Sequence, residues 1–286
     1  MTLAAGVIGH PVKHSISPQF QQAAFDHLRL DVRYEAHEVA PEDVPSFLDR
    51  LRGGCWLGCN VTIPHKRAAL EGADELPAEA REIGAVNTLI VDRARLIGHN
   101  TDAEGFLRAL TDEARFEPRG TAAVLLGAGG AALAVAVGLA RAGVRRLWIA
   151  NRSIDRAHAL AARLGDRVET AVLPLDDGAL RRPLSEAQLL VNSTSIGMSS
   201  GPAPGQSPLS SSLLGPHLLV YDLVYNPART PLLEAADSTG ARTLEGLPML
   251  IYQGAASFER WTGRPAPVDV MMEAGRRALA ARTAHG

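Results

Sequence analysis

The sequence is low in net charge, aromatic residues and cysteine. Its 286 residues carry a formal net charge of −2, so the chain lacks the basic surface with which proteins bind nucleic acid or anionic membranes. No apolar run approaches the about 18 residues of a membrane span, and the start, MTLAAGVIGHPVKHS, does not resemble a signal peptide. Cys55 and Cys59 are too few for a disulfide framework, and without a His-rich partner set they make no zinc site. We therefore expect a cytoplasmic protein that acts on small molecules and uses no metal.

Strand-like and helix-like segments alternate along the chain, which predicts an α/β fold with mostly parallel sheets in two domains. In the first half we expect strands at 4–10, 32–39 and 55–61, helices at 19–28 and 41–51, and a hairpin from 84–88 and 96–99. In the second half we expect strands from 121, at 144–150, near 167–172, at 188–192 and, as the last strand, at 217–223. An irregular Pro-containing passage precedes residue 188, and the Gly/Pro/Ser-rich loop 199–212 has the composition of a mobile segment.

The final helical segments, 249–261 and 268–280, have no strands of their own. We therefore expect them to pack back on the first domain. Polar residues at segment ends indicate that residues 1–104 with 243–286 form a substrate-binding domain. A glycine-rich turn after the strand from 121 indicates that the inserted residues 105–242 form a Rossmann-type dinucleotide-binding domain.

An apolar run and a glycine-rich turn at Thr121–Ala132 predict a dinucleotide site. Gly127, Gly129 and Ala132 form a G-x-G-x-x-A pattern before a small-residue helix. Gly127 permits the tight turn, Gly129 allows the backbone to approach a pyrophosphate, and Ala132 lets the helix lie close to the strand. The free N–H groups at the start of that helix would face the phosphate.

The end of the next strand predicts which dinucleotide binds. An NAD site commonly has an acidic residue there to accept from the ribose 2′-hydroxyl, but here Asn151-Arg152-Ser153 carries none. Arg152, with Arg156 one turn later, suits a 2′-phosphate, and a positive charge at a helix start is otherwise unfavourable. The pattern favours NADP.

Polar residues lie at segment ends of the first half. Ser17 is a candidate N-cap for the first helix, with Pro18 in its first turn, but capping does not explain Ser15. Lys66 begins a helix after the third strand, and Asn87 and Asp102 flank the hairpin. Each of these has an ordinary structural explanation. Together they are the kind of cluster that a hydroxylated, charged substrate needs.

Ordered motifs along nearly the whole chain resemble the shikimate dehydrogenase family. In the first half they are Gly9-x-Pro11-x-x-His14-Ser15-x-Ser17-Pro18, Asn60-Val61-Thr62-x-Pro64-x-Lys66, Gly84-Ala85-Val86-Asn87-Thr88 and Gly98-x-Asn100-Thr101-Asp102-x-x-Gly105. In the second half they are Gly127-Ala128-Gly129-Gly130-Ala131, Asn151-Arg152-Ser153, Asn192-Ser193-Thr194-Ser195, Tyr225-Asn226-Pro227 and Gly246-x-x-Met249-Leu250-x-x-Gln253. The resemblance implies reversible, NADPH-dependent reduction of 3-dehydroshikimate to shikimate in aromatic amino-acid biosynthesis.

The resemblance also implies roles for individual residues. Lys66 and Asp102 would handle the proton at the reacting C3 oxygen. The implied contacts to the substrate come from Ser15, Ser17 and Tyr225 at the carboxylate, from Thr62, Asn87 and Gln253 at the ring hydroxyls, and from Lys66 and Asp102 at C3. The implied contacts to NADP come from Gly127, Ala128, Gly129, Gly130, Ala131, Asn151, Arg152, Ser153, Arg156, Thr194, Leu223 and Gly246.

The chain departs from the family pattern at two places, and other readings stay open. Gln21-Gln22 stands where His-Asn is common, inside the first helix, and Ser153 replaces the usual threonine. Relatives that act on quinate often have threonine at the second serine and an acid in the cofactor turn, so Ser17 and Arg152 favour shikimate and NADP. The alternatives are a quinate or aminoshikimate dehydrogenase, a methylene-tetrahydrofolate dehydrogenase of similar plan, and a ligand sensor without turnover. The partner would be a small molecule, and the enzyme a monomer or homodimer.

Overall fold

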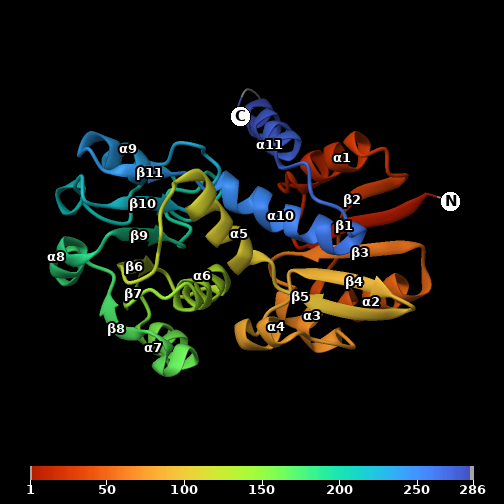
Figure 1. Ribbon diagram of the computed structural model, residues 1–286, viewed down its shortest axis with the longest axis horizontal. Helices are drawn as coiled ribbons and strands as arrows, with labels where there is room; N and C mark the ends of the chain where they lie inside the picture. The colour runs from red at the N-terminus through yellow and green to blue at the C-terminus, as the bar shows by residue number, and fades with distance from the viewer. Residues whose placement is uncertain (1, 284–286) are drawn as a thin grey trace. The chain divides into compact units, whose positions relative to one another are not determined.

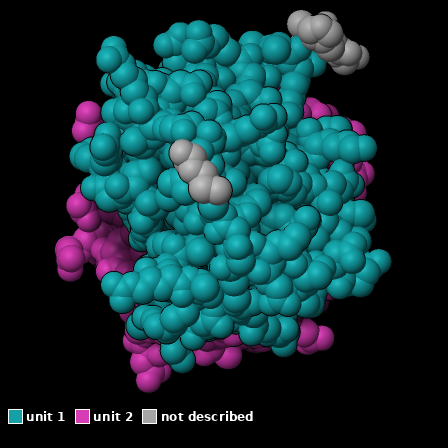
Figure 2. All heavy atoms as spheres, turned by 90° about the vertical axis from the view of Figure 1, so that its right-hand side faces the viewer, with its two compact units in different colours: residues 1–105, 250–286 teal, residues 106–249 magenta. Residues whose placement is uncertain are grey.

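A computed structural model of the chain describes residues 2–283, which divide into two compact units (Figure 1). Unit 1 consists of Met1–Gly105 and Leu250–Gly286, and unit 2 consists of Phe106–Met249; Figure 2 colours them teal and magenta. Each unit contains one β-sheet with helices, so the predicted α/β fold class is confirmed. None of the helices within residues 2–283 is long and apolar enough to cross a lipid bilayer.

The sheet of unit 1 has five strands in the order β2-β1-β3-β4-β5. Its strands are β1 (Leu3–Gly9), β2 (Val32–Glu38), β3 (Trp56–Val61), β4 (Thr88–Asp92) and β5 (Arg95–His99). β1 pairs in parallel with β2 and β3, whereas β4 and β5 form the predicted antiparallel hairpin. The carboxyl ends of β1 and β3 therefore share one edge with the start of β4 and the end of β5.

Helices cover this sheet. They are α1 (Ser17–His27), α2 (Val44–Gly53) after the short helix Pro41–Asp43, α3 (Lys66–Gly72), α4 (Ala78–Ile83), α5 (Asp102–Arg108), α10 (Leu247–Thr262) and α11 (Val268–Thr283). Phe25 of α1 packs on Phe258 of α10, with ring centroids 4.9 Å apart, and α11 packs against α1. The C-terminal helices thus return to the first unit, as predicted.

The sheet of unit 2 has six parallel strands in the order β11-β10-β9-β6-β7-β8. They are β6 (Ala122–Leu126), β7 (Arg146–Asn151), β8 (Glu169–Pro174), β9 (Leu189–Asn192), β10 (Leu219–Asp222) and β11 (Arg242–Leu244). Every residue of β6, β9 and β10 is buried, because helices cover the faces of a parallel sheet. This is the arrangement of a Rossmann-type domain.

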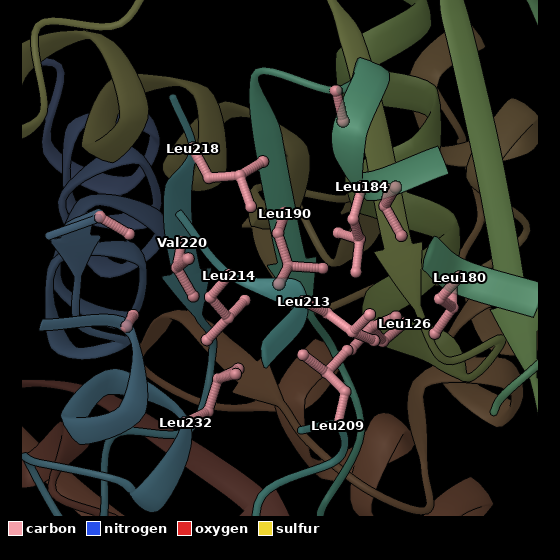
Figure 3. Close-up of a cluster of buried hydrophobic side chains, with 14 of the residues drawn as sticks. Leu126, Leu180, Leu184, Leu190, Leu209, Leu213, Leu214, Leu218, Val220 and Leu232 are labelled. Carbon is pink, nitrogen blue, oxygen red and sulfur yellow. The ribbon is translucent and has the colours of Figure 1, made fainter. Parts of the chain in front are cut away.

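The connecting helices of unit 2 are α6 (Gly130–Arg141), α7 (Ile154–Leu164), α8 (Asp177–Glu186) and α9 (Pro231–Ser238). Short helical turns occur at Ala109–Glu113, Gly165–Arg167 and Ser211–Leu213. Leu190 and Val220 of the sheet pack with Leu184 of α8 and Leu213 in one apolar cluster (Figure 3). Leu209 joins the same cluster, so the segment 199–212 is anchored near its end despite its polar composition.

Three local predictions were wrong. Ser17 is the first residue of α1 and not its N-cap, which is Ile16 without a side-chain bond; Pro18 does lie in the first turn. The passage before residue 188 is not irregular, because Asp176 caps α8 by accepting from Ala179 N and the helix accommodates Pro183. Residues 217–223 are not the last strand, since β11 pairs with β10 after α9.

Candidate active site

Polar side chains gather in unit 1 where β3 ends, β4 begins and β5 ends. Thr88 of β4 pairs with Asn60 of β3 on one side and with His99 of β5 on the other. One residue before β4, Asn87 N donates to the His99 carbonyl at 3.0 Å. The hairpin pairing therefore brings Asn87 beside the segment that leads from β5 into Asp102.

Lys66 and Asp102 form an ion pair in this cluster. Lys66 Nζ lies 2.5 Å from Asp102 Oδ2, and the two side chains are 23% and 10% exposed. The Lys66 carbonyl accepts from Val86 N at 3.0 Å, and Asp102 N donates to Asn100 Oδ1 at 3.0 Å. Backbone contacts thus fix both residues, while the ammonium stays accessible. A lysine held in this way can donate a proton and stabilise negative charge on an oxygen.

The Asn87 amide joins this ion pair to α10. Asn87 Nδ2 donates to Asp102 Oδ1 at 2.7 Å and to Gln253 Oε1 at 3.2 Å, and Asn87 Oδ1 accepts from Thr101 N at 2.8 Å. Asn87 is fully buried and Gln253 nearly so. The structure therefore brings together four residues that the sequence predicts for the substrate site: Lys66, Asn87, Asp102 and Gln253.

A second layer of polar residues behind them was not predicted as part of the site. Ser257 Oγ lies 2.7 Å from Thr88 Oγ1 and accepts from Asn60 Nδ2 at 2.9 Å, and Tyr34 Oη donates to Asn60 Oδ1 at 2.8 Å. All four are buried, and burial raises the pKa of Tyr34 well above its usual value, so the phenol remains a donor. Asn60 could have indicated this layer from the sequence. It is a polar residue inside an otherwise apolar strand, and such a residue needs a buried hydrogen-bond partner.

The two serines of the β1–α1 loop lie next to each other. Ser17 N donates to Ser15 Oγ at 3.2 Å, and the Ser17 side chain is buried. Thr62 follows β3 and lies against Gly9 at the end of β1, where a Cβ atom would be 2.6 Å from the Thr62 methyl group. Glycine is needed at position 9 because β1 and the loop after β3 approach so closely. Ser15, Ser17 and Thr62 thus follow adjacent strands.

The glycine turn of unit 2 has the geometry of a phosphate site. Gly127 has a φ of +104°, and a Cβ there would lie 2.6 Å from Ser193 Oγ. A Cβ at Gly129 or Gly130 would meet nothing within 4 Å, and α6 begins without a side-chain cap. Its first N–H groups are therefore available to an anion, and buried Ala132 lets α6 lie close. The exposed or partly exposed residues of this turn are Ala128, Gly129, Gly130 and Ala131.

Two arginines follow β7. Asn151 Nδ2 donates to the Ser153 carbonyl at 2.8 Å and shapes the turn into α7. Arg152 and Arg156 are exposed, and neither forms an ion pair within the described part of the chain. Unpaired cations at a helix N-terminus oppose the helix dipole, so an anion bound there would be stabilising.

A buried carboxylate organises the loops after β9 and β10. Asp222 Oδ1 accepts from Asn192 Nδ2 at 2.9 Å and from Val224 N at 3.1 Å, and Asp222 Oδ2 accepts from Thr230 Oγ1 at 2.6 Å. Asn192 Oδ1 in turn accepts from Thr194 Oγ1 at 2.7 Å. Burial raises the pKa of Asp222, and the three hydrogen bonds act against that rise. Asp222 was not among the predicted site residues.

Gly246 packs against the chain that leaves β10. A Cβ at Gly246 would collide with the Leu223 carbonyl, so these two predicted cofactor residues lie in contact. Leu223 N donates to the Asn192 carbonyl at 2.9 Å, which ties this segment to the end of β9. Tyr225 follows in the same segment of unit 2, and its contact with the substrate stays a prediction.

Comparison with known proteins matches most of the chain to one family. The model of the shikimate dehydrogenase substrate-binding domain matches residues 7–89, that of shikimate/quinate 5-dehydrogenase residues 112–199, and that of the shikimate 5′-dehydrogenase C-terminal domain residues 246–274. The shikimate dehydrogenase (NADP(+)) of Methanopyrus kandleri is 48% identical over 279 residues, covering 96% of this chain and 94% of that protein.

Solved structures of a shikimate dehydrogenase and a quinate dehydrogenase also resemble this chain. Shikimate 5-dehydrogenase from Thermus thermophilus, in complex with NADP(H) and shikimate, superposes with a TM-score of 0.87 at 42% identity, over 97% of this chain and 100% of that chain. Quinate dehydrogenase from Corynebacterium glutamicum, in complex with NAD, gives a TM-score of 0.88 at 31% identity, over 96% and 99%. On sequence identity over nearly its full length, the chain belongs to the shikimate dehydrogenase family.

Proposed function

We propose that this protein is an NADP-dependent shikimate dehydrogenase that reversibly reduces 3-dehydroshikimate to shikimate. The observation that carries the proposal is the Lys66–Asp102 ion pair, which stands among amide and hydroxyl groups suited to a polyhydroxylated ring. In this proposal, substrate binds to unit 1 and the dinucleotide to unit 2. We also propose that the enzyme is cytoplasmic.

In the proposed substrate site, neutral groups recognise the ligand. Ser15 and Ser17 would hold the carboxylate, and Thr62, Asn87 and Gln253 would bind the ring hydroxyls. Buried groups of this kind discriminate well, because a ligand that lacks a matching hydroxyl leaves them without a partner.

The residues of unit 2 fit NADP. The open space at Gly129 and Gly130 and the uncapped start of α6 suit a pyrophosphate, and Arg152 and Arg156 suit a 2′-phosphate. The bound cofactor supplies a hydride in the reductive direction and accepts one in the other. Asp222 and Asn192 would hold the Thr194 turn that borders this site.

Lys66 manages the proton at the reacting oxygen. As C3 of the ketone gains a hydride, its oxygen gains negative charge, and the Lys66 ammonium donates a proton to form the hydroxyl. In oxidation the neutral amine takes that proton back. Asp102 orients the amine through its 2.5 Å contact, and Asn87 holds the other carboxylate oxygen at 2.7 Å.

The test is nicotinamide absorbance against time for the purified protein, with shikimate or quinate crossed with NADP or NAD. We expect turnover with shikimate and NADP, and we expect Lys66→Ala to lose about 10²- to 10⁴-fold in kcat with little change in KM. Arg67→Ala is the matched control, because Arg67 is the exposed neighbour of Lys66 and, among residues 2–283, forms its ion pair with Glu71 on its own helix. A preference for quinate or NAD would overturn the specificity, and a Lys66→Ala variant with normal turnover would overturn the mechanism.

A further inference from the structure

The last helix of the chain reaches the loop that carries the two serines. Arg282, near the end of α11, donates from Nη1 to the His14 carbonyl at 2.5 Å and from Nη2 to the Ser15 carbonyl at 3.0 Å. It is only partly exposed, and the helix that carries it packs against α1. A guanidinium with two donors on consecutive carbonyls holds that loop at a defined position, because its fork is rigid.

The charge of Arg282 is not neutralised by a carboxylate. Within residues 2–283 its hydrogen-bond acceptors are the two carbonyls, whereas other partly buried arginines of unit 1 face acids: Arg52 contacts Asp74, and Arg260 contacts Glu104. A carbonyl oxygen accepts the hydrogen bond but does not cancel the positive charge. The serine loop therefore has an uncompensated cation on the carbonyl side of its peptides.

The start of α1 adds to the same field. This helix has no acidic residue in its first turn and no side-chain cap, so its own described residues place no anion at the positive end of its dipole. Neutral serine hydroxyls donate hydrogen bonds to a carboxylate but supply no positive charge to balance it. A nearby unneutralised guanidinium supplies the charge that the hydroxyls lack.

We propose that Arg282 is a positioning and specificity-determining residue that favours an anionic substrate by holding the serine loop and placing a positive charge behind it. Arg282 does not touch the ligand in this proposal, and it acts through Ser15 and its neighbours. The inference rests on the proposed function, in which Ser15 and Ser17 bind the substrate carboxylate. It assigns a substrate-binding role to the C-terminal helix, which the sequence motifs did not include.

The proposal separates binding from chemistry. Removal of the charge should weaken the substrate complex and its transition state equally, because the carboxylate does not react; this raises KM and leaves kcat unchanged. A partly exposed charge that does not touch the ligand is partly screened, so we expect Arg282→Gln to raise the KM for shikimate about fivefold to tenfold. The KM for NADP should stay within about twofold of wild type.

The experiment compares wild type, Arg282→Gln, Arg282→Lys and the control Arg276→Gln by steady-state kinetics at low and high salt. Arg276 is exposed on the same helix and has no partner in the described structure. We expect Arg282→Lys to recover part of the affinity, because it restores the charge but not the two-donor contact. We expect Arg276→Gln to match wild type, and the defect of Arg282→Gln to shrink at high salt. In Arg282→Gln a carboxamide analogue of shikimate should lose less affinity than shikimate does, because it depends on the position of the loop but carries no charge for Arg282 to attract.

Two results would overturn the inference. One is an unchanged KM for shikimate in Arg282→Gln while wild type turns shikimate over. The other is an equal loss of affinity for shikimate and its carboxamide, which would mean that Arg282 only stabilises the fold of the loop. Failure of wild type to act on shikimate would instead refute the proposed function, so the two failures are distinguishable.

Discussion

Gly105 is a residue at which the structure predicts a clear effect of a single added methyl group on the proposed substrate site. It lies on α5, one turn after Asp102, so both residues share one helical face. A Cβ at position 105 would lie 2.5 Å from Gln253 N and 2.7 Å from Gln253 Cβ. The obstacle is the backbone of α10, which cannot rotate away as a side chain could. Gly105→Ala must therefore push apart the helices that carry Asp102 and Gln253.

The size of the effect follows from this geometry. Ordinary van der Waals contact begins near 3.4 Å, so α5 and α10 must separate by roughly 0.9 Å at this point. Overpacking costs about 1–3 kcal/mol, and alanine returns about 1 kcal/mol through its higher helix propensity. We expect a net loss of about 1 kcal/mol in the free energy of unfolding. A displacement of about 1 Å in a catalytic group can cost about 100-fold in rate, so kcat/KM for shikimate should fall by about two orders of magnitude.

The assay is urea unfolding together with steady-state kinetics on the Gly105→Ala variant. Gly53→Ala is the control, because Gly53 is also in a helix of unit 1 and a Cβ there meets nothing within 4 Å. The control should be equal to or more stable than wild type, with unchanged kinetics. Wild-type kcat/KM in Gly105→Ala, or an equal rise in the KM for NADP, would refute the argument that the α5–α10 contact aligns the substrate residues.

Three further predictions concern the cofactor unit and pH. Arg152→Asp should weaken the binding of NADPH much more than the binding of NADH, because only NADPH carries the 2′-phosphate that the guanidinium would contact. Asp222→Ala should lower the free energy of unfolding by about 2–4 kcal/mol, since three buried donors lose their acceptor, whereas Asp222→Asn retains an acceptor and should lose less. Burial lowers the pKa of His37 and His99, so below about pH 6.5 the unfolded chain binds more protons and the free energy of unfolding should decrease as pH falls.

Each of these predictions has a control. Arg181→Asp reverses a charge on an exposed residue of α8 and should affect both cofactors equally. If Arg152→Asp lost equal affinity for NADPH and NADH, Arg152 would not bind the 2′-phosphate. If Asp222→Ala and Asp222→Asn lowered the free energy of unfolding equally, the stability of these loops would not depend on the hydrogen bonds that Asp222 accepts. For the pH effect, urea unfolding of His37→Phe should show a shallower decline between pH 7 and 5; an unchanged slope would exclude His37 as a source.

The strands β6, β9 and β10 of unit 2 were largely predictable because nearly all of their residues are apolar. Residues 122–126 are all buried, as continuous apolar runs in parallel sheets are. α8 was missed because Pro183 is a poor helix former, and only the Asp176 cap and the buried Leu180 and Leu184 favour the helix. β11 has three residues, of which one is buried, so no periodicity could indicate it. Ser17 was misplaced because an N-cap and the first helical residue differ by one position.

The site was predictable only where a residue type is unusual at its position. Lys66 and Asp102 are far apart in the chain, and their pairing depends on the β4–β5 hairpin, whose register no motif states. Ser257 could not be found from sequence, because a serine one turn after Gln253 on a helix has many structural explanations. Arg282 was missed for a related reason: an arginine near a chain end is usually solvated, and its acceptors are backbone carbonyls without any sequence signature.

The β4–β5 hairpin explains how the neutral Asn87 amide can fix the position of the Lys66–Asp102 ion pair. Asn87 is fixed by its backbone bond to His99, and its amide then bonds the Asp102 carboxylate that lies three residues after His99. The other oxygen of this carboxylate contacts Lys66 Nζ. The register of β4 and β5 therefore also determines the position of the ammonium. A shift of one residue in this register would turn every side chain of the strand to the other face of the sheet. The pairing of β4 with β5 therefore holds the ammonium at one position. The flexible side chain of Lys66 is therefore held at one position, as the proposed proton transfer requires.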